Sequence, residues 1–64
     1  MSLRKIPINL ANEEELKSLP GIGPRTARAV LDFLETVGRI DEHNLSCIPY
    51  IRISRELLDL IDFS

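Results

Sequence analysis

The chain has 64 residues and one cysteine, so it is expected to form one small domain, residues 1–64, without an internal disulfide. Hydrophobic residues make up 44% and charged residues 28% of it, which is typical of a globular domain. The formal net charge of −2 argues against a protein that coats nucleic acid by bulk attraction, and no apolar run approaches the roughly 20 residues that span a membrane.

The N-terminal residues are expected to precede the helical part of the chain. We expect residues 1–3 to come from cloning rather than from the native protein, and residues 4–11 to form an extended arm, because Pro7 opposes helix. Asn12, followed three residues later by Glu15, is a capping-box pattern. A first helix is therefore predicted to begin directly after the cap.

The segment that follows this helix is the most informative part of the sequence. The helix is expected over residues 13–18, since residues ahead of Pro20 avoid helical geometry. Residues 19–25 then read Leu-Pro-Gly-Ile-Gly-Pro-Arg, in which two glycines allow a sharp turn and close approach to a ligand. Pro24 suits the first turn of a new helix, whose unpaired N–H groups and dipole attract anions. Arg25 adds positive charge, so this hairpin is predicted to bind phosphate.

Capping residues and hydrophobic spacing predict three further helices. The second should end before Gly38, which suits the left-handed position after a helix. Asp41 predicts a third helix over residues 42–46, and Ser54 predicts a fourth over residues 55–63. With four to five short helices and no strand signal, the predicted fold is an all-α small bundle. Its predicted core is Leu16, Leu19, Ile22, Ala27, Val30, Leu31, Leu34, Leu45, Ile48, Leu57 and Ile61.

Several residues at fixed spacing resemble a helix-hairpin-helix motif, and the chain is most similar to the ComEA-like competence and DNA-uptake family. The resemblance covers residues 8–30 and rests on Asn9, Ala11, Glu14-Glu15-Leu16, Leu19-Pro20-Gly21-Ile22-Gly23 and Ala27. It implies a tandem, SAM/HhH2-like arrangement of two hairpins related by a pseudo-twofold axis. The alternative is a simple helical hairpin whose loop holds two glycines by coincidence.

The second hairpin that the resemblance implies falls at Ile48-Pro49-Tyr50-Ile51-Arg52. Tyr50 and Arg52 stand where that family has glycines, and a tyrosine at positive φ is a backbone outlier. We therefore expect this turn to have a different geometry, with Tyr50 packed against apolar neighbours. The second hairpin is predicted to be degenerate and to make no backbone contact with phosphate.

For the first hairpin the resemblance implies sequence-independent DNA binding. The residues that would bind phosphate are Gly21, Ile22, Gly23, Arg25, Arg28 and Lys17. A monovalent cation, K⁺ or Na⁺, would lie between the phosphate and the carbonyls of Lys17, Leu19 and Ile22. Because every nucleotide carries the same phosphate, such binding reads no sequence, and with few phosphates engaged it should be weak and salt-dependent. The expected partner is double-stranded DNA.

Other chemistry has little support in the sequence. His43 and Cys47 are four residues apart, but a zinc site needs three or four ligands, so we expect His43 at the surface and Cys47 in the core. The chain is not expected to be an enzyme. Two alternatives stay open: a protein-interaction or structural module that keeps the fold without DNA binding, and a DNA-targeting domain of a larger protein. The compartment also stays open, either cytoplasmic or, for a ComEA-type protein, extracytoplasmic.

Overall fold

Helix α1, Glu13–Lys17, begins where the sequence predicts because its cap is closed from both sides. In the computed structural model, which describes residues 5–63, the Asn12 side chain accepts a hydrogen bond from the Glu15 N–H at 2.9 Å. The Glu15 carboxylate in turn accepts one from the Asn12 N–H at 3.0 Å. The predicted start of this helix is confirmed, and the helix ends at Lys17 with Ser18 as its C-cap, one residue before the predicted end. Residues 1–3, for which a cloning origin is expected, lie outside the described residues.

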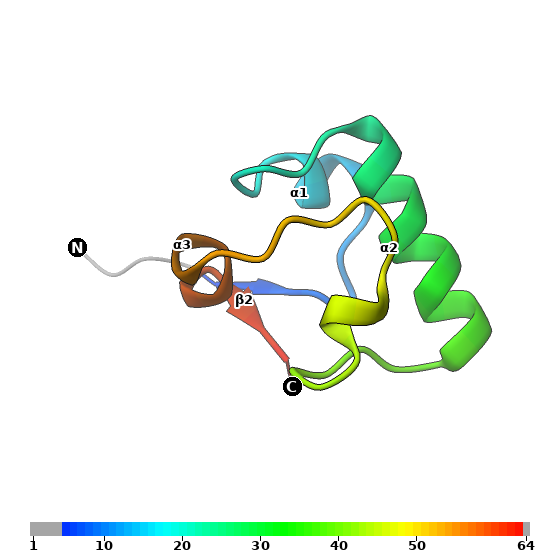
Figure 1. Cartoon of the computed structure of the whole chain (residues 1–64). Helices are drawn as coiled ribbons and strands as arrows, with labels where there is room; N and C mark the ends of the chain where they lie inside the picture. Colours follow the sequence, from blue (N-terminus) through cyan, green and yellow to red (C-terminus); the bar gives the residue numbers. More distant parts are fainter. Residues whose placement is uncertain (1–4, 64) are drawn as a thin grey trace.

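Helix α2, Pro24–Val37, is the longest element and forms one side of the molecule (Figure 1). Pro24 occupies its first turn, and Gly38 ends it with a left-handed φ of 94°, both as predicted. Its inner face carries the fully buried Ala27 and Val30. Leu31 and Leu34, predicted as core, are only half-buried and pack against that core from its edge.

The third predicted helix, residues 42–46, is replaced by a turn and a short 3₁₀ helix, η1, Leu45–Cys47. Asp41 and Asn44 bind each other reciprocally, each side chain accepting the other's backbone N–H at 2.8 Å. This pair closes a turn but is followed by a 3₁₀ helix of only three residues. The prediction of an α-helix here is therefore wrong.

The fourth predicted helix, residues 55–63, is also too long. Helix α3, Arg55–Asp59, starts after Ser54, whose hydroxyl accepts from the Leu57 N–H at 3.1 Å, but it stops before the chain becomes extended. Strand β2, Ile61–Asp62, pairs in parallel with strand β1, Ile6–Pro7. Pairing with a distant strand therefore overrides the helical pattern at this end of the chain.

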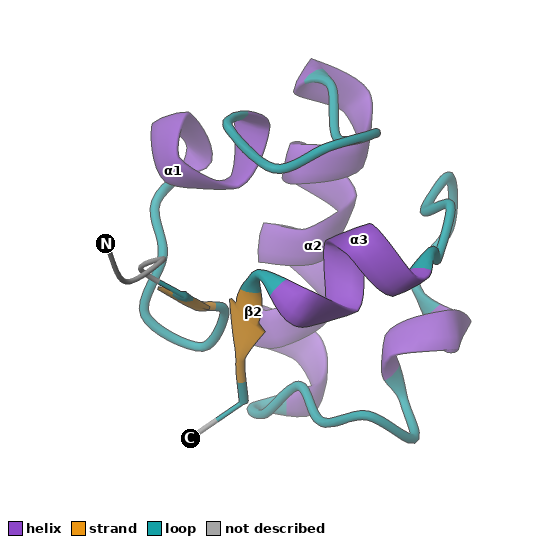
Figure 2. Ribbon diagram, turned by 90° about the vertical axis from the view of Figure 1, so that its left-hand side faces the viewer, coloured by secondary structure: helices purple, strands orange, loops and turns teal. Residues whose placement is uncertain are grey.

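The β1–β2 pair joins the two ends of the described chain, which lie side by side in Figures 1 and 2. The Ile6 N–H donates to the Leu60 carbonyl at 2.8 Å, and the Ile8 N–H donates to the Asp62 carbonyl at 3.1 Å. Pro7, between these two donors, has no N–H and leaves the ladder intact. The prediction that the chain contains no β-strand is therefore wrong.

Residues 4–11, predicted as an extended arm, are extended only at β1; Arg4 lies outside the described residues. Residues 8–10 form a turn, and Ile8 is fully buried. The Asn9 side chain holds this turn against Ile40, accepting from its N–H at 2.7 Å and donating to its carbonyl at 3.0 Å. Ile8 and Ala11 of this segment therefore belong to the core, whereas Leu10 is exposed.

The described residues form a mostly helical fold of three α-helices, one 3₁₀ helix and a two-stranded parallel pair, fewer helices than predicted. None of these helices has the length and apolar character needed to cross a membrane. All predicted core residues except Leu31 and Leu34 are buried, and the structure adds four apolar residues that the pattern missed. The buried core is Ile8, Ala11, Leu16, Leu19, Ile22, Ala27, Ala29, Val30, Ile40, Leu45, Ile48, Leu57 and Ile61.

Candidate functional site

The first hairpin, residues 19–25, presents two glycines to solvent on either side of a buried isoleucine. Gly21 has a φ of 78°, a left-handed value that glycine adopts readily, and Gly23 is the extended N-cap of α2. Both are exposed, and a Cβ added to either would meet no atom within 4 Å. Ile22 is only 5% exposed and anchors the turn in the core. This is the orientation that the sequence predicted.

Backbone donors gather where the first hairpin enters α2. Within the described residues, no acceptor is found for the N–H groups of Gly21, Gly23, Arg25 and Thr26. They lie at the start of a 14-residue helix, where the dipole adds positive potential. The Ile22 N–H, in contrast, donates to the Leu19 carbonyl at 3.2 Å. Ile22 is therefore not a free donor in this conformation, and its contribution to the site is its anchoring side chain.

The three basic residues predicted for the site differ in their surroundings. Arg25 and Arg28 are exposed on the first two turns of α2. Lys17 is partly buried and ion-paired within its own helix, at 3.9 Å from Glu13 and 3.5 Å from Glu14. Two acidic neighbours offset the charge of Lys17, so the positive potential at the hairpin comes mainly from the two arginines.

The second hairpin, residues 48–52, repeats the left-handed φ of the first hairpin at one residue. Tyr50 has a φ of 68° and is the one non-glycine residue with positive φ among the described residues. It stands in the second hairpin where Gly21, with a φ of 78°, stands in the first. The bend therefore has a left-handed tyrosine, which the sequence analysis did not expect, whereas the exit differs: α2 begins directly after Gly23, and α3 begins three residues after Arg52.

Tyr50 is also not packed as the sequence predicted. Its side chain is 65% exposed, and the Arg25 guanidinium lies 5.2 Å from the centre of its ring. Its carbonyl accepts a hydrogen bond from the Thr26 hydroxyl at 3.1 Å. Both contacts come from the first turn of α2, so the second hairpin is fastened beside the free donors of the first.

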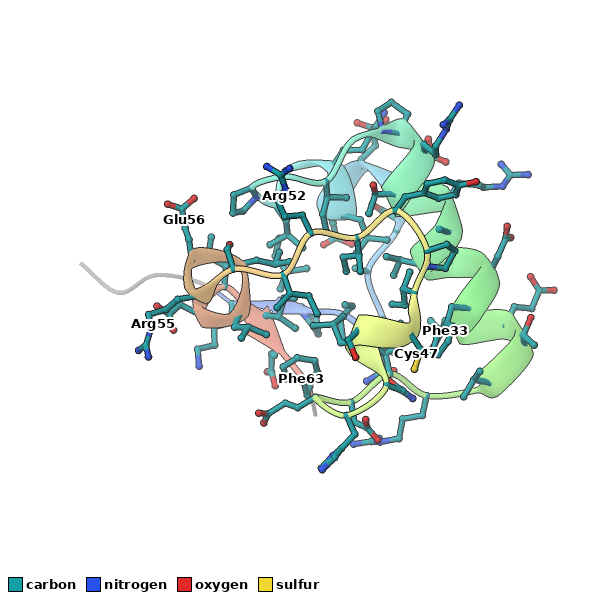
Figure 3. The ribbon with its side chains drawn as sticks, viewed as in Figure 1. Phe33, Cys47, Arg52, Arg55, Glu56 and Phe63 are labelled. Carbon is teal, nitrogen blue, oxygen red and sulfur yellow. The ribbon has the colours of Figure 1, made fainter. Side chains whose placement is uncertain are left out.

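Arg52, in the second hairpin, and Arg55, the first residue of α3, point in different directions (Figure 3). Figure 3 shows Arg52 directed toward the edge of the molecule that carries the first hairpin, whereas Arg55 points away from it. Both are exposed. Arg52, one of the two substitutions that made this hairpin degenerate in sequence, therefore adds positive charge on the side of the first hairpin.

An open groove of about 560 Å³ lies along the start of α2 beside Tyr50. It is lined by Glu13, Pro24, Arg25, Arg28, Ala29, Asp32, Pro49 and Tyr50. Prolines and an aromatic ring supply apolar walls, and two guanidinium groups supply positive charge. The hydrophobic pattern of α2 does not reveal this groove, because its far wall comes from the second hairpin.

The carbonyl groups named for a monovalent cation have spare acceptor capacity. Those of Lys17 and Ile22 accept no hydrogen bond within the described residues, and that of Leu19 accepts one, leaving a second lone pair.

The second candidate metal site was the pair His43 and Cys47, and both residues are exposed. The prediction that Cys47 lies in the core is therefore wrong. In the described part of the chain, His, Cys, Asp and Glu form no metal-binding group of three.

The comparison with known proteins concerns the first hairpin and the helices on either side of it. Residues 8–33 match the model of the helix-hairpin-helix motif, which covers α1, the first hairpin and most of α2. No curated protein and no solved structure matches the chain. The chain therefore carries a helix-hairpin-helix motif in its first half, a motif generally associated with DNA binding without sequence specificity.

Proposed function

We propose that the protein binds DNA without sequence preference by donating backbone hydrogen bonds from the first hairpin to phosphate oxygens. The observation that carries this proposal is the exposure of Gly21 and Gly23, whose N–H groups have no acceptor within the described residues. Glycine at both positions lets the backbone approach a phosphate without a side chain between them. The buried Ile22 holds this backbone in place before a ligand arrives.

The donors in this proposal differ from those predicted by sequence. The Ile22 N–H is bound to Leu19, so the donors are the N–H groups of Gly21 and Gly23, with those at the start of α2. Arg25 and Arg28 supply side-chain charge. With few phosphates engaged, the affinity is low and falls steeply with salt, because each neutralised phosphate releases counterions.

The proposal includes a K⁺ or Na⁺ at the same hairpin, where carbonyl oxygens remain available. The carbonyls of Lys17, Leu19 and Ile22 each retain an acceptor lone pair, and oxygen is the ligand atom that hard cations prefer. The carbonyls of Lys17, Leu19 and Ile22 would hold the cation, which would supply positive charge for binding DNA. The partner in this proposal is duplex DNA, and the chain acts as a binding module rather than an enzyme, alone or as the DNA-targeting part of a larger protein.

We further propose that the two hairpins are related copies, as expected of a ComEA-like tandem domain. Asp41 and Asn44 bind each other before the second hairpin as Asn12 and Glu15 do before the first. The left-handed residue of the first bend has its counterpart in Tyr50. The two segments therefore share these structural features although their sequences differ at the glycine positions.

The test is fluorescence anisotropy with a labelled duplex at about 50 mM salt, comparing the wild type with Gly23→Ala. Gly23 has an ordinary φ of −99°, and the new methyl group meets no atom within 4 Å, so the variant should fold. The methyl group stands where the phosphate must approach, and we expect at least a tenfold loss of affinity. Thr36→Ala, in the last turns of α2, is the matched control and should bind like the wild type.

Equal binding by the wild type and Gly23→Ala would remove the first hairpin from the mechanism. No binding by the wild type at low salt would contradict DNA binding altogether. The module would then be assigned to the alternative class, a protein-interaction or structural role.

A further inference from the structure

Folding alone does not require the backbone conformation of Tyr50 or the exposure of its ring. Its φ of 68° lies in the region that L side chains rarely adopt, and its ring remains 65% exposed. Glycine at this bend would remove both the strain and the exposed aromatic surface. Strained backbone conformations tend to gather at functional sites, where the surrounding structure maintains them.

The ring is held in place by α2 rather than projecting from a free loop. The Thr26 hydroxyl donates to the Tyr50 carbonyl at 3.1 Å, and because Thr26 is only 7% exposed this bond is partly buried. The Arg25 guanidinium lies over the ring at 5.2 Å from its centre. The ring is 65% exposed beside this cation, so it retains surface that a planar ligand can cover.

The groove beside the ring matches the chemistry of a nucleotide. Its apolar walls include Pro24 and Pro49, and its charged groups are two arginines and two acids, Glu13 and Asp32. Guanidinium groups bind phosphate, and carboxylates accept hydrogen bonds from exocyclic amino groups of bases. Its volume of about 560 Å³ is within the range of clefts that bind small ligands.

We propose that Tyr50 is a stacking platform for an unpaired nucleobase, so that the domain prefers single-stranded or locally unpaired DNA to an intact duplex. The inference rests on the proposed phosphate contact of the first hairpin, which lies at the same end of α2 as the ring. Every base has a π face, so stacking adds affinity without sequence preference. In an intact duplex the bases already stack on each other, and Tyr50 reaches none without unstacking a step.

Intrinsic fluorescence measures this contact directly, because Tyr50 is the one tyrosine of the chain and the chain has no tryptophan. Intrinsic tyrosine fluorescence is measured while three ligands are added: a single strand, an intact duplex, and a strand of equal length with abasic sites. N-acetyltyrosinamide corrects for absorption by DNA. We expect strong quenching by the single strand, and little by the duplex or the abasic strand, which offer phosphates without an accessible base.

Affinity measurements by anisotropy use Tyr50→Ala and Tyr50→Phe. Since stacking on an aromatic side chain contributes about 1–3 kcal/mol per base, Tyr50→Ala should lose roughly five- to 150-fold in affinity for the single strand. Its affinity for the duplex should be nearly unchanged, and Tyr50→Phe should bind both like the wild type. Circular dichroism checks that each variant is folded.

The outcomes separate this inference from the proposed function. Equal losses of Tyr50→Ala on single strand and duplex, or wild-type binding without quenching by the single strand, would overturn the stacking platform and leave the phosphate contact standing. Loss of binding to every DNA in Gly23→Ala, together with tighter binding of the single strand than of the duplex by the wild type, supports both. If the wild type bound no DNA at all, both proposals would fail.

Discussion

Gly21 and Tyr50 share the left-handed backbone conformation at the bends of the two hairpins, with φ values of 78° and 68°. One bend uses the residue that tolerates this region, and the other uses a large aromatic residue that does not. The two bends therefore have similar backbones but opposite surfaces: bare N–H groups at the first and an exposed ring at the second.

The strain at Tyr50 is measurable by comparing Tyr50→Gly with Tyr50→Ala. Both variants lose the ring and its contact with Arg25, but only alanine keeps a Cβ in the left-handed region. We expect the glycine variant to have the higher free energy of unfolding, by about 1 kcal/mol, measured by urea denaturation. At most exposed sites outside this region alanine is the more stable of the two, so that order at Tyr50 would contradict the assigned φ.

The buried side chain of Ile22 should be essential to the fold. Its truncation in Ile22→Ala is expected to cost about 2–5 kcal/mol, which removes most of the stability of so small a domain. Thermal unfolding followed by circular dichroism measures this. Ile22→Val, expected to cost about 0.5–1.5 kcal/mol, stays folded and keeps the prediction measurable. Ile53→Ala, at a site 39% exposed, is the control, and an equal loss there would contradict the anchoring role.

The salt dependence of DNA binding should distinguish Arg28 from Lys17. Arg28 is exposed in the groove beside the first hairpin, whereas Lys17 is paired with Glu13 and Glu14. We expect Arg28→Ala to reduce the slope of log affinity against log salt by about 0.9 on a duplex. Lys17→Ala should change it by clearly less. The reverse order would show that Lys17 exchanges its acidic partners for phosphate.

Stability in acid should depend on Asp41. Its carboxylate accepts the backbone N–H groups of Asn44 and His43, each at 2.8 Å, and these hydrogen bonds hold its pKa below the ordinary value of 3.8. A group with a lowered pKa in the folded state stabilises that state above its ordinary pKa. The contribution is lost as the pH falls through the lowered value.

Asp41→Asn isolates this effect, because asparagine keeps an oxygen that accepts the same N–H groups but does not titrate in acid. We expect the wild type to lose thermal stability relative to this variant as the pH falls below 3.8. The measurement is the melting temperature of both proteins over about pH 2–6. A difference between the two that stays constant over this range would contradict the assignment.

Local features of the chain were predictable because they depend on neighbours within one helical turn. The cap made by Asn12 and Glu15, the start of α2 at Pro24 and its end at Gly38 all follow from backbone preferences of single residues or from hydrogen bonds three residues apart. The outward glycines around Ile22 followed from the same reasoning. The helix-hairpin-helix motif and the exposed glycines of its hairpin could therefore be predicted from the sequence.

Contacts between distant segments decided the rest. Helix α3 ends at Asp59 because the following residues pair with β1, and a two-residue strand has no periodic signal of its own. Ile40 is core because Asn9 binds its backbone across the chain. Tyr50 lies beside the first hairpin because Thr26 and Arg25 hold it there. The sequence by itself determined the turns and caps; only the tertiary structure determined which of them meet, because those contacts join residues far apart along the chain.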